Sequence, residues 1–231
     1  MSIMALAYNL SDKIPGWVVV IGFCVALCAF FLARSSKSRR GDFPASTWKL
    51  ELGFAAFFLS FAVTRVLFLF SDFERLANDE SRLYQTYVLF GYLSSLVGIA
   101  NLARLADTHL LSSRRRVLTW TSVGLVVVNS AFIVAAVTAG LEALHVPRLV
   151  VYGSTGLVFA FVMVIYGKLA RQSSGVLRRN AWTTLAGAAV AVAGVLMDSD
   201  YLAQAGLIPI WVPAVVVLVG LSLFALGQRR V

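Results

Sequence analysis

Seven long apolar segments alternate with short polar connections along the chain. A helix needs about 20 predominantly apolar residues to cross the hydrocarbon core of a bilayer, and about 17–25 are tolerated. Because lipid offers no partner to backbone N–H and C=O groups, such a segment is expected to satisfy them internally, as a helix does. The pattern predicts seven spanning helices, at residues 17–33, 50–70, 84–103, 117–138, 149–167, 181–197 and 208–227.

The connections between these segments are neither Cys-rich nor repetitive, and they leave no room for a second folded domain. We therefore expect an all-α integral membrane protein in which residues 1–231 form one domain, a single bundle of seven transmembrane helices. The basic stretch SSKSRR at 35–40 follows the first apolar segment, whereas a cleaved signal peptide carries its positive charge before the apolar run. We expect the first helix to be retained.

The basic residues predict the orientation of the bundle. Of the 20 Lys and Arg residues, 15 lie in the first, third and fifth connections and the C-terminal tail. Four lie in the other connections and the N-terminal tail, and one, Arg65, lies within a segment. Since cytoplasmic loops carry an excess of Lys and Arg, the N-terminus is expected outside and the C-terminus in the cytoplasm.

Composition supports a membrane environment. The chain is 59% hydrophobic and 13% charged, with mean hydropathy +0.83, whereas soluble domains are about 45–50% apolar and about 25% charged. These values exclude a water-soluble enzyme, a disordered chain and a disulfide-stapled secreted module. The net charge of +9 does not indicate nucleic-acid binding, because the basic residues form short clusters between apolar runs, as in loops that face anionic lipid. We expect a multi-pass protein of the cell membrane with lipids as partners.

Small residues spaced three or four apart mark candidate contact faces, because helices in lipid associate by close backbone approach. Alternatively, these residues reflect only the general abundance of small side chains in membrane helices. The sixth segment carries the densest such stripe and is expected to pack centrally or against a partner protein. The three stripes are Gly91, Ser95 and Gly98; Gly156 and Ala160; and Gly187, Ala191 and Gly194.

Arg65 is the outstanding candidate for a functional residue, because ionisable groups within a membrane are costly and rare. It lies about five residues from the outer end of the second segment, several ångström inside the hydrocarbon. Asp72 follows seven residues later on the same helical face. One hypothesis makes Arg65 a contact for an anion or lipid headgroup in an outward-facing cavity. The other makes it a structural arginine that reaches the interface or pairs with Asp72 or another acid.

Tyr84, Gln85 and Tyr87, with Tyr92 beyond them, begin the third segment on the outer side. If the second and third helices touch, an antiparallel arrangement brings these residues to a depth comparable to that of Arg65, where they would line a polar pocket. Tyrosines are also common at membrane interfaces without any ligand. Asn129 lies near the middle of the fourth segment, either as an interhelical hydrogen-bond donor or as a transport residue.

Other polar residues have simpler expected roles. Arg104 and Asp107, three residues apart near the inner end of the third helix, are expected to pair locally. The five tryptophans fall near segment ends, where indole rings anchor a helix at the interface. A solvated acidic rim is expected outside, comprising Asp72, Glu74, Asp79, Glu80, Asp198 and Asp200.

Several chemistries lack their residues. His109 and His145 fall in or beside loops, which argues against haem or a zinc-dependent hydrolase between the helices. No nucleophile turn or phosphate-cradling loop is present. The topology matches that of rhodopsins, but segment 208–227 contains no lysine for a retinal Schiff base there. We expect no cofactor and no metal site, and a membrane enzyme is the weakest hypothesis.

The leading hypothesis is a non-enzymatic, receptor-like or accessory membrane protein. It would bind a small or lipidic ligand, or a membrane or cytoplasmic partner protein, and no nucleic acid. The candidate ligand-binding residues lie in its outer half: Arg65, Asp72, Tyr84, Gln85, Tyr87 and Asn129. The alternative is a small transporter or channel with a polar path near Arg65 and Asn129.

Overall fold

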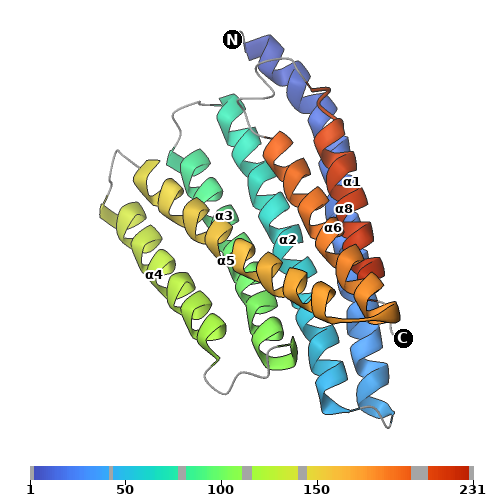
Figure 1. The fold of residues 1–231 in the computed structure, drawn as a ribbon. Coiled ribbons are helices and arrows are strands. Elements are labelled where there is room, and N and C mark those ends of the chain that lie inside the picture. The colour runs from blue at the N-terminus through green and yellow to red at the C-terminus, as the bar shows by residue number, and fades with distance from the viewer. Residues whose placement is uncertain are drawn as a thin grey trace. The chain divides into compact units, whose positions relative to one another are not determined.

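The computed structural model describes residues 3–41, 44–77, 82–110, 116–139, 145–198 and 208–228. Of these residues, 94% are helical and none forms a strand, which confirms the all-α prediction. Figure 1 shows the helices in order along the chain. They are α1 (Ile3–Arg40), α2 (Ala45–Ala77), α3 (Arg82–Leu105), η1 (Ala106–Leu110), α4 (Val117–Ala139), α5 (His145–Gln172), α6 (Gly175–Met197) and α8 (Val212–Gly227).

Each of the seven predicted apolar segments forms a helix, but the last is shorter than expected. Six helices of the described part of the chain are long and apolar enough to cross a bilayer, and α8 has 16 residues. Helix α8 begins at Val212 rather than Ile208, because Pro209 lies in a turn that Val212 closes with a hydrogen bond to its carbonyl. Pro213 is tolerated in the first turn, where its missing N–H costs no helical bond. Six long apolar helices are those of a multi-pass membrane protein.

The chain divides into two compact units, Met1–Phe23 with Met163–Val231, and Cys24–Val162. The expectation of one domain therefore stays a prediction, and each unit is described by itself.

In the unit Cys24–Val162, α2 and α3 form an antiparallel pair that is packed along its length (Figure 1). Small residues of α3 make this possible, as predicted for two of them. A Cβ atom on Gly98 would lie 2.9 Å from that of Ser60, and one on Gly91 would lie 2.5 Å from the Phe68 ring. Ser94, next to the predicted Ser95, also contacts α2, since its Oγ donates to the Ser60 carbonyl at 3.0 Å.

In the same unit, helix α4 packs against α3 through an apolar cluster. Leu89 of α3, Ile133 and Ala136 of α4, and Val151 of α5 are at most 1% exposed and pack together. At one end of α4, the Arg82 guanidinium donates to the carbonyl of Val137, one of the terminal carbonyls that a helix leaves without intrahelical partners.

Asp107 forms the connection at the other end of α4. Its carboxylate is 2% exposed and accepts hydrogen bonds from Thr119 N at 2.7 Å and Thr119 Oγ1 at 2.9 Å. It thus caps one of the free N–H groups in the first turn of α4, where a negative charge is also favoured by the helix dipole. The predicted local pair between Arg104 and Asp107 is wrong, because the carboxylate serves α4 and Arg104 is exposed.

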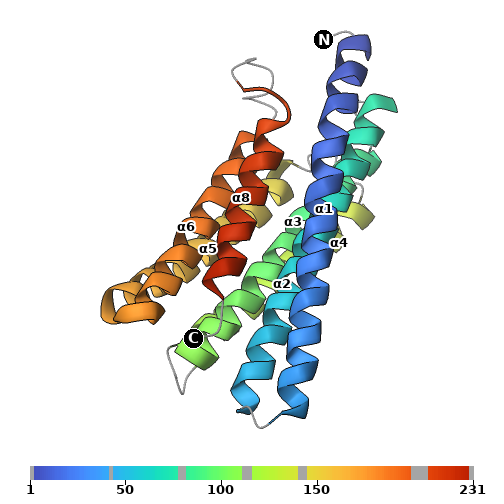
Figure 2. The same ribbon diagram turned by 90° about the vertical axis from the view of Figure 1, so that its right-hand side faces the viewer.

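In the other unit, α6 and α8 lie side by side in direct backbone contact (Figure 2). A Cβ atom on Gly187 would lie 2.3 Å from Phe224 N, and one on Gly194 would lie 2.8 Å from Val217 N. Gly220 approaches the backbone of Ala191 equally closely. The stripe predicted on the sixth segment is therefore a helix contact face, and its partner is α8.

Lys13 and Asp198 form an ion pair in this same unit, with 3.2 Å between Nζ and Oδ1. Asp198 is therefore paired, not simply part of a solvated acidic rim. Asp79, Glu80 and Asp200 of that rim lie outside the described residues. So do Arg114, Arg115, Arg229 and Arg230, four of the basic residues used to predict the orientation. On α5, the predicted contact residues Gly156 and Ala160 are exposed, and a Cβ on Gly156 would meet no atom within 4 Å.

Substitution of glycines tests whether α6 and α8 depend on backbone contact. We expect Gly187→Ala to lower the free energy of unfolding by about 1–3 kcal/mol, because its methyl group would overlap the backbone of α8. Gly124→Ala on α4 is the matched control, since nothing lies within 4 Å of its Cβ position. The control should be neutral or stabilising by up to about 1 kcal/mol, from helix propensity. Thermal unfolding in detergent measures both, and equal effects would contradict the contact.

Candidate functional site

Arg65 is 3% exposed, although its guanidinium is charged at any physiological pH. It lies near the middle of α2 with Phe61 one turn before it and Phe68 one turn after it. Its Cζ atom is 5.3 Å from the centroid of the Phe61 ring and 5.7 Å from that of Phe68. Residues three and four apart share a helix face, so the guanidinium lies in an aromatic slot formed by its own helix. Cation–π contacts of this kind contribute about 0.5–2 kcal/mol each.

The predicted tyrosines lie farther toward the end of α2. The Arg75 guanidinium is 5.8 Å from the centroid of Tyr84, and the rings of Phe70 and Tyr87 are 5.8 Å apart. Arg75 is ten residues from Arg65, which places Tyr84 about 15 Å along the helix from Arg65 at ~1.5 Å per residue. The cross-helix register therefore brings Tyr84 and Tyr87 to α2, at a level different from that of Arg65.

Asp72 and Gln85 are both half-buried on these same two helix ends. Asp72 lies on α2 between the levels of Arg65 and Arg75, and Gln85 follows Tyr84 on α3. These two residues and the tyrosines thus lie together near the end of α2, apart from Arg65. Whether either group binds a ligand stays a prediction.

Tyr92 of α3 contacts Phe68, which lies three residues after Arg65 on α2. Its ring meets Phe68 edge-on, with 5.2 Å between centroids, and it also packs against the apolar cluster that contains Ile133. Phe68 in turn contacts the Arg65 guanidinium. Tyr92 therefore connects the aromatic slot of α2 to the α4 side of α3.

Asn129 is one helical turn from Ile133 and is 1% exposed. Its Nδ2 donates to the Leu125 carbonyl at 2.7 Å and to Ser154 Oγ of α5 at 3.2 Å. Its Oδ1 is buried and accepts no hydrogen bond. Asn129 thus makes the predicted interhelical bond and keeps one acceptor available for a small donor. Tyr92 packs against the cluster of Ile133 and also contacts Phe68. Asn129 is one turn before Ile133, and Arg65 is one turn before Phe68. Asn129 and Arg65 therefore lie at roughly the same level along their helices.

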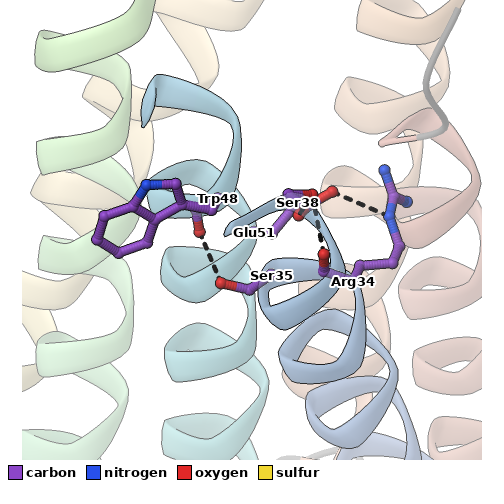
Figure 3. Close-up of polar contacts among 5 residues, drawn as sticks. All are labelled: Arg34, Ser35, Ser38, Trp48 and Glu51. Atoms are coloured by element: carbon purple, nitrogen blue, oxygen red, sulfur yellow. Dashed lines mark hydrogen bonds and ion pairs between the residues drawn. The ribbon is translucent and has the colours of Figure 1, made fainter. Parts of the chain in front are cut away.

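A second polar group was not predicted from the sequence. Glu51 is 3% exposed and lies in the second turn of α2, where it faces the end of α1 (Figure 3). Its Oε1 accepts from Arg34 Nε at 3.1 Å, and its Oε2 accepts from Ser38 Oγ at 2.7 Å. Ser35 Oγ donates to the Trp48 carbonyl at 2.9 Å. These contacts, which we call the α1–α2 clamp, fix the end of α1 against the start of α2.

The signal for the clamp was present in the sequence. Glu51 falls inside the predicted segment 50–70, and the cost argument that singles out Arg65 applies equally to a carboxylate. The identity of its partners, however, follows only from the pairing of α1 with α2.

No metal site is formed by the side chains whose positions are described, since no three His, Cys, Asp or Glu side chains come together there. Cys24 and Cys28 are buried free cysteines on one face of α1. Comparison of the chain with protein-family models, curated proteins and solved structures finds no match.

Glu51→Gln tests the strength of the clamp. Removing one partner of a buried pair costs about 3–5 kcal/mol. We expect a smaller loss of about 2 kcal/mol, because the Arg34 side chain is 21% exposed and regains some hydration. Unfolding in mixed micelles measures the loss. Glu74→Gln, at the other end of α2 and only half-buried, should have little effect. A double-mutant cycle of Arg34→Gln with Glu51→Gln that shows no coupling would contradict the clamp.

Proposed function

We propose that this chain is a seven-crossing protein of the cell membrane, with its N-terminus outside and its C-terminus in the cytoplasm. It would act as a non-enzymatic receptor-like or accessory protein that binds a small or lipidic ligand, or a partner protein, through its outer half. Helix α8 spans about 24 Å, and a bilayer accommodates such a short span by local thinning.

The membrane part of this proposal is supported by the exposed apolar surface. Only 22% of the most apolar 18-residue stretch of α4 is buried within the structure. Val127, Val128 and Val134 are each more than half exposed. Monomeric soluble proteins rarely expose contiguous apolar patches larger than a few hundred Å². A helix with this much exposed apolar surface is suited to contact with lipid tails rather than with water.

The binding part rests on one observation, the burial of Arg65 between Phe61 and Phe68. A guanidinium presents a planar fork of N–H donors that suits carboxylate and phosphate groups. The flanking rings suit an apolar chain. An anionic amphiphile matches both features, so the preferred ligand is one with a carboxylate or phosphate head and an acyl chain. Arg65 supplies binding rather than proton transfer, because arginine keeps its proton in proteins, and this favours a non-enzymatic role.

A small transporter or channel is the second candidate. It is favoured by the Asn129 Oδ1 atom, a buried acceptor without a donor at roughly the depth of Arg65. A solute moving past both residues would meet the Arg65 guanidinium and the Asn129 Oδ1 acceptor along its path.

Oleate and its neutral counterpart oleyl alcohol test the binding proposal. We expect oleate, but not oleyl alcohol, to raise the Tm of the detergent-solubilised protein in a concentration-dependent manner, since a ligand that binds only the folded state stabilises it. Arg65→Gln should abolish this rise, and Arg65→Lys should weaken it, because the charge remains while the planar fork is lost.

Arg104→Gln is the matched control, because Arg104 is an exposed arginine at the end of α3. It should keep the full oleate effect. Equal stabilisation of the wild type and Arg65→Gln, or no stabilisation of the wild type, would contradict the proposed ligand class. Oleate flux across proteoliposomes that Arg65→Gln abolishes would favour the transporter.

A further inference from the structure

The end of α1 and the start of α2 carry a concentrated basic surface. Lys37, Arg39 and Arg40 of α1 and Lys49 of α2 are all exposed. Arg34 and Glu51 lie beneath them and balance each other's charge in the α1–α2 clamp. The four exposed residues form no ion pair with any side chain whose position is described. Asp42, the acid nearest in sequence, lies outside the described residues, and even with it this end carries a net charge of +3.

Trp48 contacts two of these four basic residues. The Arg39 guanidinium is 5.9 Å from the centroid of the indole ring, and Lys49 Nζ is 5.5 Å from it. Two cations from different helices are thus gathered around one half-buried aromatic side chain. Exposed flexible side chains are otherwise expected to spread apart, because like charges repel.

The clamp fixes this arrangement. Ser35 holds the backbone of Trp48 itself, and Glu51 holds both Arg34 and Ser38, the residue that precedes Arg39 (Figure 3). The register of α1 against α2 is therefore set within one turn of the two cations. Arg39 and Lys49 are brought together by the fold and not by proximity in sequence.

An apolar flank continues from this basic surface along both helices. Leu32 and Leu52 are 43% and 44% exposed. Leu32 lies seven residues before Arg39 and Leu52 three residues after Lys49, so each shares a helix face with one of the two cations. A molecule with an anionic head at Trp48 could lay its acyl chains along this flank.

We propose that Arg39, Lys49 and Trp48 form a binding site for the phosphate headgroup of an anionic phospholipid in the bilayer around the protein. This inference rests on the membrane embedding in the proposed function. The ends of two apolar helices place the site at the headgroup level, where tryptophan is also favoured. Clusters of Lys and Arg beside a membrane helix are attracted to anionic lipid, with a contribution equivalent to about fivefold in the binding constant for each residue.

Native mass spectrometry of the full chain in neutral detergent tests the site, with dioleoylphosphatidylglycerol and dioleoylphosphatidylcholine as probes. The wild type should bind the first phosphatidylglycerol in preference to phosphatidylcholine. The double variant Arg39→Gln/Lys49→Gln should raise the Kd for phosphatidylglycerol roughly 25-fold, as two losses of about fivefold combine, and leave the Kd for phosphatidylcholine unchanged.

The matched control is Lys168→Gln/Arg171→Gln, which removes two exposed basic residues at the end of α5 and the same total charge. It should change the Kd for phosphatidylglycerol less than threefold. Equal losses in the two double variants, or no loss in either, would overturn the site. Displacement of phosphatidylglycerol by a polyglutamate peptide that binds more tightly would also overturn it, in favour of an acidic protein partner.

The proposed function can fail separately. Its oleate test concerns Arg65, and variants at Arg39 and Lys49 leave Arg65 and its two phenylalanines intact. If oleate fails to raise the Tm of the wild type while phosphatidylglycerol still binds through Arg39 and Lys49, the ligand proposed for Arg65 is rejected. The phospholipid site is then retained.

Discussion

Hydrocarbon offers no hydrogen bonds, and this constraint shapes every level of the structure. Backbone groups are satisfied within helices, which accounts for a chain that is helical almost throughout its described part. The hydroxyl side chains follow the same rule. Thr64, Ser122, Ser130 and Ser222 each donate to the carbonyl four residues earlier, so that no partner outside the helix is needed. Polar side chains that instead form hydrogen bonds with another helix mark the places where helices are joined.

Besides neutral hydrogen bonds such as that of Ser94 with Ser60, two kinds of contact join helices. Glycine permits backbones to touch, as at Gly187 and Gly220, and such contacts are gained without any polar group. Carboxylates make the other kind: Glu51 joins α1 to α2, and Asp107 joins η1 to the start of α4. Each carboxylate is buried and accepts hydrogen bonds, since an unsatisfied buried charge would be far more costly than a satisfied one. Arg65 is a further buried charge, and its position between two phenylalanines is the basis of the proposed ligand site.

The helices and the main glycine contacts were predictable because both depend on local features, apolar length and small-residue spacing. The partners of Glu51 and Asp107 were not, since each acts between elements whose pairing the sequence does not reveal. The same reason explains why the distance of Tyr84 from Arg65 was not predicted. The contact of α2 with α3 entered the sequence analysis only as a condition, and its register was not predicted. It is the register that places Tyr84 opposite Arg75 and about 15 Å from Arg65. The late start of α8 follows from Pro209 and its turn, a local effect that apolar counting overlooks.

Embedding of the chain with its basic connections on one side underlies both binding proposals. Single cysteines introduced at Ser36, Ser174 and Leu83, all exposed, in a background lacking Cys24 and Cys28, allow that arrangement to be measured with a membrane-impermeant maleimide. In intact cells we expect labelling of Leu83→Cys alone, with Ser36→Cys and Ser174→Cys labelled only after permeabilisation. Labelling of Ser36→Cys and Ser174→Cys from opposite faces of the membrane would contradict it.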